Sequence, residues 1–562
     1  MSAPETPDQS SPSQSSPRLF WVGLLLITLV GFAIRLYAGK HEHMSYDEWQ
    51  HVFMASGARM TDVLYEVRTN AHPLLFFLLL RGLLKLGHAQ LLYRSISILA
   101  GTCSIVLVGL IARRVLRSQV LQLLCVAAFT LSASAIIISI QVRSYQLAVV
   151  MVLLAFLSYL DMIPAPRGPV SLRPYVIFAI ASSLAVWSLY ASIFFVGASI
   201  AVPAVLAAVS GSFRKRLIAG LSTKSVCLSV ASFALPCFVF AGHLDHMRQQ
   251  VIQGYVYDFY WGMKLDETVS GFVLTNARNF FNLFSPLQLE SPVVFLLIII
   301  ALGAAGLWAY RRALRGEPGM KADSLLPVAF AAVMVAGLLA ASLARQYPFG
   351  GLMRHQYIVA PFLLLAAFVF LDALSALAAP VLRRGISILV GAAILANPAF
   401  NWEKVVEFPD SVVLTNEFGD YSAAFPQARA VYVDSFSVWG YFVHTDDGAR
   451  RFVRRVTDPA WIDEYRIQGG GHDGTLIFYD KTRFHLSFSD PSLYESLAAC
   501  LRQSGVDELV LFWFAPGDTP VGQDTVALQK LIREKAAEQG LTATKLFVPE
   551  GAVFASFRLA AR

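Results

Sequence analysis

The chain has 562 residues, of which 56% are hydrophobic and only 15% are charged, and its mean hydropathy is +0.56. Soluble domains carry about 25% charged residues, so these values exclude an ordinary soluble protein and predict an integral membrane protein. The apolar segments are long and unbroken, which excludes a β-barrel with its short alternating strands. The excess of 45 Lys and Arg over 38 Asp and Glu is expected in cytoplasmic loops and does not indicate nucleic-acid binding.

The N-terminal residues and the first apolar segments set the predicted topology. Residues 1–18 are rich in Ser, Pro and Gln and are predicted to form a disordered cytoplasmic tail. The apolar run after them lacks a basic flank, which indicates an uncleaved span instead of a signal peptide. Segment 73–87 contains Arg81 and Lys85, and two central charges cost roughly 5 to 7 kcal/mol on the insertion scale. We therefore expect it to lie on the outer surface as an amphipathic helix, with its basic side chains among the headgroups.

Eleven spans are predicted, and the positive-inside rule orients them. With the N-terminus inside, every loop rich in Lys and Arg faces the cytoplasm, whereas residues 39–90, 242–290, 344–356 and 401–562 face the outside. The predicted spans are residues 19–38, 91–112, 119–140, 145–162, 174–189, 192–210, 224–241, 291–310, 324–343, 357–379 and 386–400.

Residues 401–562 have the patterning of a soluble domain, and we expect a small α/β fold there. The predicted strands are residues 431–436, 474–480, 508–514 and 552–559, and the predicted helices are residues 491–504 and 525–539. The sequence has no P-loop and no Gly-rich dinucleotide fingerprint. This argues against a nucleotide-driven pump and against a nucleotide-cofactor enzyme.

The densest polar cluster follows the first span, in KHEHMSYDEWQHV at residues 40–52. On local sequence alone, Asp47 can simply cap the helix that starts here. The functional alternative is that Asp47 and Glu48 form a carboxylate pair that takes a proton from an acceptor hydroxyl. His41 and His43 could hold a divalent cation together with these carboxylates. Their spacing is not a zinc signature, however, so we expect no metal.

Three segments, in this order, carry a family resemblance. The acidic pair is followed by AHPLLFFLLL at residues 71–80, and IQVRSYQLA at residues 140–148 opens a later span. This order resembles the type C (GT-C) glycosyltransferases, and within them the branch of the protein O-mannosyltransferases and bacterial aminoarabinose transferases. In that branch an Asp-Glu pair in the first outer loop precedes a His-Pro-Pro or Lys-Pro-Pro segment, and an Arg-x-Tyr motif opens a later span. The resemblance covers roughly residues 20–210, with one proline, at position 73, where the family often has two.

The resemblance implies an α-helical polytopic GT-C fold with its catalytic part in residues 19–400. The predicted topology places the α/β domain of residues 401–562 on the outer or periplasmic face. The resemblance also implies inverting transfer of a sugar from a polyprenyl-phosphate-linked donor in the outer leaflet to an acceptor hydroxyl. The acceptor would be a glycan, a lipid or a protein. Neither a nucleotide nor an obligatory metal is implied, so no cofactor is expected.

The same resemblance assigns roles to individual residues. Asp47 matches the general base and Glu48 its acidic neighbour, which can position the base or the acceptor. Arg143 matches the basic residue that meets the donor phosphate, because a guanidinium fork fits the phosphate oxygens and stabilises the departing anion. Arg143 could instead be an interface anchor at a helix end, beside Tyr145. The other candidates for binding the donor phosphate or the sugar are His72, Tyr145, Arg354, His355 and Tyr357.

Two other classes of function stay open at this point. A transporter or flippase for a lipid-linked or charged solute would place ionisable residues near the bilayer midplane, whereas most strong polar groups here are predicted at the outer surface. An outer-face scaffold would not require eleven spans. The sequence contains no Asn-x-Ser/Thr site, which favours a bacterial inner membrane over a secretory-pathway membrane. It identifies neither the sugar nor the acceptor.

Overall fold

A computed structural model describes most of the helical part and separate segments of the C-terminal part. Residues 17–244 are described except 43, 58, 69–71, 88, 163–170, 210 and 221, and residues 323–394 except 345, 348, 350–352, 378–380 and 393. The described C-terminal segments are residues 429–434, 451–455, 462–468, 474–480, 487–514, 525–547 and 554–561. The predicted span 291–310 lies outside the described residues, as do residues 393 and 395–400 of the predicted span 386–400.

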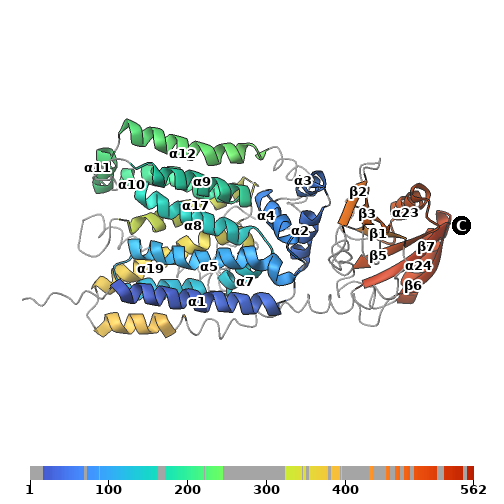
Figure 1. The fold of residues 1–562 in the computed structure, drawn as a ribbon, viewed down its shortest axis with the longest axis horizontal. Helices are drawn as coiled ribbons and strands as arrows, with labels where there is room; N and C mark the ends of the chain where they lie inside the picture. Colours follow the sequence, from blue (N-terminus) through green and yellow to red (C-terminus); the bar gives the residue numbers. More distant parts are fainter. Residues whose placement is uncertain are drawn as a thin grey trace, which may run out of the picture.

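The helical part is a bundle of long apolar helices, as expected of a multi-pass membrane protein (Figure 1). Within the described ranges, six helices are long and apolar enough to cross a membrane, or eight if two bent pairs each count as one span. The helix in the predicted span 174–189 has only 16 residues. The bundle helices are α1 Pro17–His41, α5 Gln90–Val115, α6 Gln119–Leu131, α7 Ala133–Ile140, α8 Tyr145–Met162, α9 Arg173–Ser188, α10 Ser192–Val209, α11 Gly211–Gly220, α12 Thr223–Ala241, α17 Leu325–Leu343, α18 Met353–Gln356, the 3-10 turn η1 Tyr357–Val359 and α19 Ala360–Leu377.

The predicted span 119–140 is broken, which corrects the expectation of one continuous helix. Helices α6 and α7 meet at an angle of 51°. Arg35 of α1 is buried beside the break and donates to the carbonyl oxygen of Thr130 at 3.3 Å and to Ser139 Oγ at 3.1 Å. A helix end frees backbone carbonyls that must find donors, and a guanidinium can supply them. Because the chain has neither Pro nor Gly at this position, the sequence carried no local sign of the break.

The helices approach closely where small residues face one another. A Cβ atom added at Gly101 of α5 would clash with Ser139 of α7, so the backbone of α5 lies directly against this small side chain. Larger side chains fill the centre of the bundle: the Phe156 ring packs edge-on against Phe330 at 4.9 Å and Phe362 at 5.0 Å. Such close packing holds helices together in lipid, where hydrophobic burial gives little driving force.

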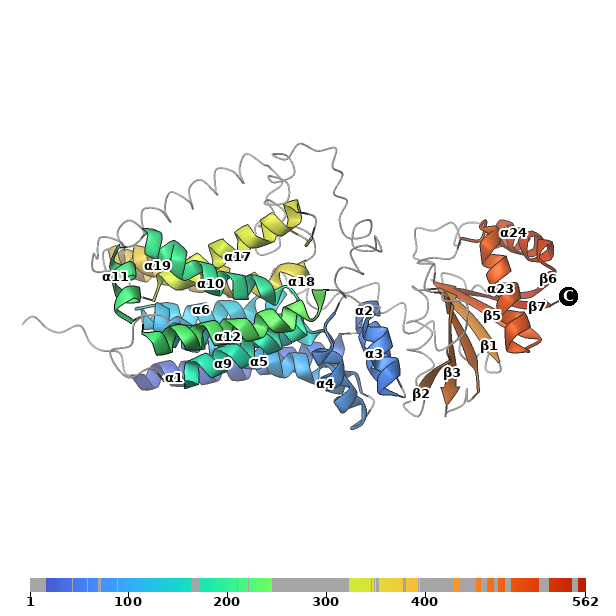
Figure 2. The ribbon, with the colours of Figure 1, turned by 90° about the horizontal axis from the view of Figure 1, so that it is seen from above.

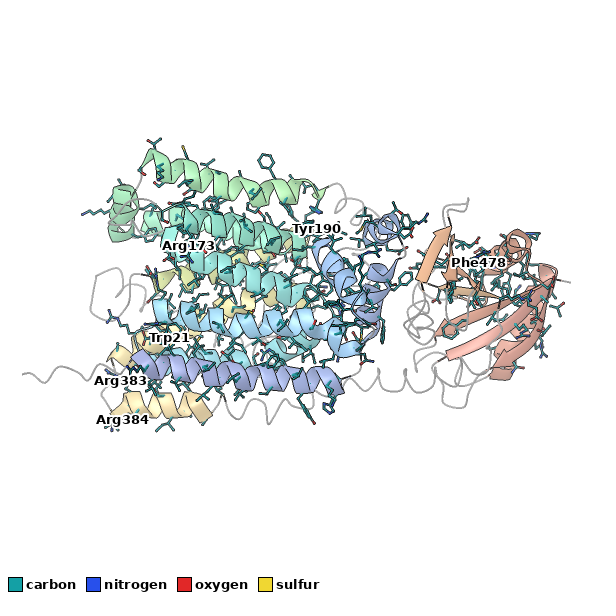
Figure 3. The ribbon with its side chains drawn as sticks, in the orientation of Figure 1. Trp21, Arg173, Tyr190, Arg383, Arg384 and Phe478 are labelled. Carbon is teal, nitrogen blue, oxygen red and sulfur yellow. The ribbon has the colours of Figure 1, made fainter. Side chains whose placement is uncertain are left out.

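The two ends of the bundle differ in chemistry (Figure 3). Trp21, Arg383 and Arg384 lie at the end far from the C-terminal sheet, and Tyr190 lies at the opposite end. At the first of these ends, Arg113 stacks over the Trp21 ring at 4.8 Å. Arginines and a tryptophan at one end match the positive-inside rule and the aromatic belt of an interface.

Three short helices lie between the bundle and the C-terminal sheet in both views (Figures 1 and 2): α2 Tyr46–Ser56, α3 Met60–Arg68 and α4 Leu75–Leu84. Helix α4 is too short to span, in line with the exclusion of residues 73–87 from the spans. The expected headgroup role of Arg81 is wrong, however. Its guanidinium donates to the carbonyl oxygens of Ala55 and Gly57 and so binds the C-terminal end of α2. Lone carbonyls at a helix end are strong acceptors for a cation.

The C-terminal part contains a seven-stranded mixed sheet of order β2-β3-β4-β1-β5-β7-β6. The central strands β4, β1 and β5 are parallel, and the outer strands pair antiparallel. Helices α23 and α24 cover one face, where Leu497 and Ile532 pack with Tyr432, Phe478 and Leu511. The elements are β1 Ala430–Asp434, β2 Arg451–Arg455, β3 Ile462–Gln468, β4 Leu476–Asp480, α23 Pro491–Ser504, β5 Glu508–Phe514, α24 Thr525–Glu538, β6 Leu541–Phe547 and β7 Phe554–Ala561.

The sheet contacts the short outer helices through Tyr465 of β3. Its buried hydroxyl donates to a carboxylate oxygen of Glu66 in α3. Its ring packs edge-on against Phe53 of α2 at 5.6 Å. The C-terminal part therefore touches the same helix, α2, that carries Asp47.

Candidate active site

Asp47 lies in the first turn of α2, between two arginines from distant parts of the chain. Its Oδ2 atom is 2.5 Å from Nη2 of Arg143 and 2.5 Å from Nη1 of Arg354. Arg143 comes from the turn between α7 and α8, and Arg354 from α18. Folding thus brings together three of the residues that the sequence analysis proposed. A carboxylate and two guanidiniums at one point form a site suited to an anion and a proton-transfer step.

Arg143 is held in place by several contacts. Its Nη1 atom donates to the hydroxyl of Tyr145 at 3.1 Å, and its backbone carbonyl accepts from Ser97 Oγ at 3.2 Å. The side chain is only 6% exposed and faces Asp47. A headgroup anchor would extend toward the membrane surface, so this geometry favours a binding role for Arg143 over an anchoring one. Tyr145 contributes by orienting the guanidinium.

Glu48 is buried and its carboxylate is saturated with donors. It accepts from the backbone nitrogen of Ser45 at 2.7 Å and of Val142 at 2.9 Å, and from Arg94 at 3.3 Å. Val142 immediately precedes Arg143. Glu48 therefore ties the start of α2, which carries Asp47, to the turn that carries Arg143. This arrangement supports positioning instead of proton transfer as the role of Glu48.

Arg94 completes this connection and was missed by the sequence analysis. It is buried in α5, pairs with Glu48, and donates to the carbonyl oxygens of Gly39 at 2.8 Å and Glu42 at 2.6 Å. It therefore also fixes the end of α1. The available signal was an arginine inside the predicted span 91–112, where a charge is costly and usually has a specific partner.

The electrostatic setting keeps Asp47 ionised. Burial alone would raise its pKa, but Arg143 and then Arg354 outweigh this effect and hold the pKa below the ordinary value of an aspartate. With both arginines bound to it, Asp47 is therefore a charged but weak base. Its basicity depends on how strongly the two arginines bind it.

Two histidines line the same region. His51, one turn after Asp47 in α2, is buried, and its ring stacks on Phe77 at 5.1 Å. The ring of His72 lies 5.0 Å from that of His51 and packs edge-on against Tyr145 at 5.8 Å. Burial lowers the pKa of both histidines well below the ordinary value, and Arg143 lowers both further. Both rings are therefore neutral at pH 7. The predicted residue His72 thus belongs to the site, and His51 joins it.

The remaining predicted residues divide into two groups. His355 lies close enough to interact electrostatically with Asp47 and Arg143, and its carbonyl accepts from the Tyr347 hydroxyl at 2.9 Å. Tyr357 instead belongs to the buried core of the bundle, in the neighbourhood of Arg35. The structure therefore does not place Tyr357 among the groups that surround Asp47.

The proposed cation ligands are not brought together in the described structure. The ring of His41 stacks on Tyr37 at 4.2 Å, and its Nδ1 atom bonds the Tyr37 carbonyl oxygen. His43 lies outside the described residues. Among the residues that are described, no group of three or more His, Cys, Asp or Glu side chains could hold a metal ion.

Glu48→Gln tests the positioning role. The amide removes the negative partner of the buried Arg94, and breaking a buried pair costs about 3 to 5 kcal/mol. We expect a clear fall in Tm in detergent together with slower sugar transfer. The measurement is a thermal melt alongside a transfer assay on the same preparation. A variant with the wild-type Tm but no turnover would instead give Glu48 a direct part in the chemistry.

Comparisons with known proteins bear on the fold. No protein-family model matches the chain, and no curated protein matches it. Among solved structures, apo ArnT of Cupriavidus metallidurans, an aminoarabinose transferase, aligns with a TM-score of 0.52 at 12% identity, covering 97% of this chain and 98% of that chain. The apo oligosaccharyltransferase of Archaeoglobus fulgidus aligns with a TM-score of 0.50 at 11% identity, covering 97% of this chain and 75% of that chain.

Both structures are GT-C glycosyltransferases, so the present chain has the GT-C fold. The family resemblance inferred from the motifs is confirmed at this level. At such low identity the likeness establishes the fold and leaves the reaction to the residues of the site.

Proposed function

We propose that this protein is a membrane glycosyltransferase that moves a sugar from a polyprenyl-phosphate-linked donor to an acceptor hydroxyl. The observation that carries the proposal is the meeting of Asp47, Arg143 and Arg354 at one carboxylate oxygen. The GT-C fold of the chain supports it, because the ArnT and oligosaccharyltransferase structures that share the fold are glycosyltransferases. The sugar is a hexose or pentose, and the acceptor a glycan, a lipid or a protein.

The chemistry follows from the charges in the site. Asp47 takes the proton of the acceptor hydroxyl as its oxygen attacks the anomeric carbon from the side opposite the phosphate. The bond between that carbon and the phosphate oxygen breaks, and its electron pair stays on the lipid phosphate. Arg143 and Arg354 stabilise the negative charge that develops there. A single displacement of this kind inverts the anomeric configuration.

The two ion pairs of Asp47 explain how the base becomes active. One oxygen of Asp47 forms ion pairs with both Arg143 and Arg354. The same two guanidiniums are the proposed ligands of the donor phosphate. A phosphate that binds these arginines competes with the carboxylate for the same donors. When the phosphate binds the two arginines, it neutralises part of their positive charge. The pKa of Asp47 then rises and its basicity increases. Donor binding would thus prepare the base for the acceptor.

This exchange predicts a difference between two pH profiles. The acidic limb of the pH profile of kcat/KM for the donor reports the pKa of Asp47 before the donor binds, which lies below the ordinary aspartate value. The acidic limb of the kcat profile reports the pKa of Asp47 in the donor complex. We expect activity to fall as the pH drops below each pKa, with the limb of kcat at the higher pH. The check is to measure both profiles with saturating acceptor. A kcat limb at or below that of kcat/KM would contradict the exchange.

The same proposal assigns sidedness and domain limits. Residues 1–18 are a cytoplasmic tail, residues 19–400 the catalytic membrane part, and residues 401–562 a periplasmic domain of a bacterial inner-membrane protein. The end of the bundle that carries Trp21, Arg383 and Arg384 is then cytoplasmic, in keeping with the positive-inside rule. The donor enters from the outer leaflet, and no cofactor takes part.

Cysteine labelling tests this sidedness. Single cysteines are introduced into a cysteine-free background at two exposed positions. Leu86, just after α4, is 76% exposed, and Val381, beside Arg383, is 82% exposed. An impermeant maleimide added to intact spheroplasts is expected to label position 86 and to spare position 381. Permeabilised cells, in which both positions should react, serve as the control. The reversed pattern would invert the topology.

The activity itself requires a reconstituted assay. Purified protein in nanodiscs is supplied with undecaprenyl phosphate linked to a radiolabelled sugar, and with cell-envelope acceptors. Mass spectrometry of lipids and glycans from cells with and without the protein identifies the natural product. Transfer of label with release of undecaprenyl phosphate supports the proposal. In proteoliposomes, movement of the lipid across the bilayer without any transfer would instead support a flippase.

A further inference from the structure

A continuous series of contacts links Asp47 to two buried histidines. Arg143 contacts the Asp47 carboxylate and the Tyr145 hydroxyl, the Tyr145 ring meets His72, and His72 meets His51. The series closes where Nδ1 of His51 lies 2.8 Å from the backbone carbonyl oxygen of Asp47. The base, a phosphate ligand and two histidines therefore border one region.

The hydrogen bond of His51 defines its chemical character. A carbonyl oxygen can only accept, so Nδ1 of His51 carries the hydrogen and donates it. In the neutral ring, Nε2 then presents a lone pair and accepts hydrogen bonds only. The low pKa of His51, caused first by burial and then by Arg143, keeps the ring neutral.

This acceptor is buried and makes no hydrogen bond to the described residues. Within the described residues, Nε2 of His51 has no hydrogen-bond partner, and neither has Nδ1 of His72. A buried polar atom left unpaired is costly, and such atoms in a native protein call for an explanation. Two of them on adjacent rings, at the edge of a proposed active site, indicate that a bound molecule supplies the missing partners.

The partner of His51 must donate a hydrogen bond. A phosphodiester has no hydrogen to donate, and an acyl chain has no polar group. A sugar hydroxyl or a sugar ammonium group has both the hydrogen and a suitable size. In an in-line displacement the sugar ring lies between the base and the phosphate, and His51 lies in the series of contacts that joins Asp47 to Arg143.

We propose, resting on the function proposed above, that His51 is a specificity-determining residue whose Nε2 atom accepts a hydrogen bond from a hydroxyl of the donor sugar. The neighbouring ring of His72 borders the same sugar. The stacked ring of Phe77 holds His51 in this orientation. The substrate class is therefore a polyprenyl-phosphate sugar with a free hydrogen-bond donor on the face of the ring nearest α2.

The test separates sugar recognition from phosphate recognition. The probes are undecaprenyl phosphate itself, its glucose, galactose and mannose conjugates, and deoxy analogues of the conjugate that binds most tightly. The two matched variants are His51→Asn, whose amide nitrogen can replace Nδ1 but leaves no acceptor at Nε2, and His51→Gln, whose amide oxygen can occupy the Nε2 position. Equilibrium dissociation constants are measured in nanodiscs, without turnover.

We expect His51→Asn to bind bare undecaprenyl phosphate within about twofold of the wild type and to lose about tenfold in affinity for the glycosylated lipid. His51→Gln should retain most of the sugar contribution. One deoxy analogue should bind the wild type about tenfold more weakly than the complete conjugate does. The same analogue and the complete conjugate should bind His51→Asn equally well, which would show that the missing hydroxyl is the one that bonds His51.

The inference is overturned by equal affinity of the wild type for bare and glycosylated lipids, by an unchanged sugar contribution in His51→Asn, or by equal losses in His51→Asn and His51→Gln. A parallel loss of bare-lipid affinity in His51→Asn would make the residue structural. Failure of the wild type to bind undecaprenyl phosphate at all would remove the donor site proposed above, and the inference with it.

Discussion

Asp47→Asn is expected to lower the rate of sugar transfer by about 10²- to 10⁴-fold, the usual contribution of a general base. The amide keeps the shape of the side chain but cannot accept a proton. Donor binding should be preserved or become tighter, because Arg143 and Arg354 lose the carboxylate with which both form ion pairs in the structure. The variant thus separates proton transfer from phosphate binding.

Two measurements check this expectation. Single-turnover transfer with saturating donor reports the chemical step, and a thermal shift caused by undecaprenyl phosphate reports donor binding. The lipid should raise the Tm of Asp47→Asn at least as much as it raises that of the wild type. Asp47→Glu serves as the control that keeps a carboxylate and should retain part of the activity. Near-normal turnover in Asp47→Asn would remove Asp47 from the catalytic role.

Arg143→Lys is expected to be strongly impaired although it keeps the positive charge. In the structure one nitrogen of Arg143 meets Asp47 while another donates to Tyr145, so the guanidinium is fixed in a two-pronged orientation. A lysine ammonium is a single point and cannot reproduce both contacts. Loss of one preorganised donor to a developing oxyanion lowers kcat by about 10²- to 10³-fold, and we expect an effect of that size.

Arg354→Lys is the matched control for Arg143→Lys. Arg354 meets the same oxygen of Asp47, but its side chain is 21% exposed, against 6% for Arg143. Its contribution is therefore more screened, and its replacement should cost less. Donor affinity and kcat are measured for both variants in the same nanodisc. Wild-type behaviour of Arg143→Lys together with inactive Arg354→Lys would move the phosphate site to α18 and restore the anchoring role of Arg143.

Much of the architecture could be predicted because it depends on local properties. Hydrophobic length marks the spans, a short apolar run rich in β-branched and aromatic residues marks a strand, and helical apolar spacing marks a helix. Strand β5 and helix α23 accordingly appear at the expected residues 508–514 and 491–504. Strands β2 and β3 were not predicted, since RFVRR and IDEYRIQ are too polar to show a buried face. Strand β2 forms one edge of the sheet and β3 lies next to it, with only two buried apolar side chains, Tyr465 and Ile467, among polar residues.

The sequence by itself determined the membrane class, the acidic pair after the first span, and the motifs that resemble GT-C enzymes. Only the tertiary structure decided which partners these residues meet: Arg354 reaches Asp47 across 307 positions, and Glu48 binds Val142 across 94. It also revealed Arg94 and His51, and it placed Tyr357 in the bundle core. The physical reason is that a residue's type and its near neighbours in the chain fix its local conformation and hydrophobicity. The charges and hydrogen-bond partners around it depend on how distant helices pack.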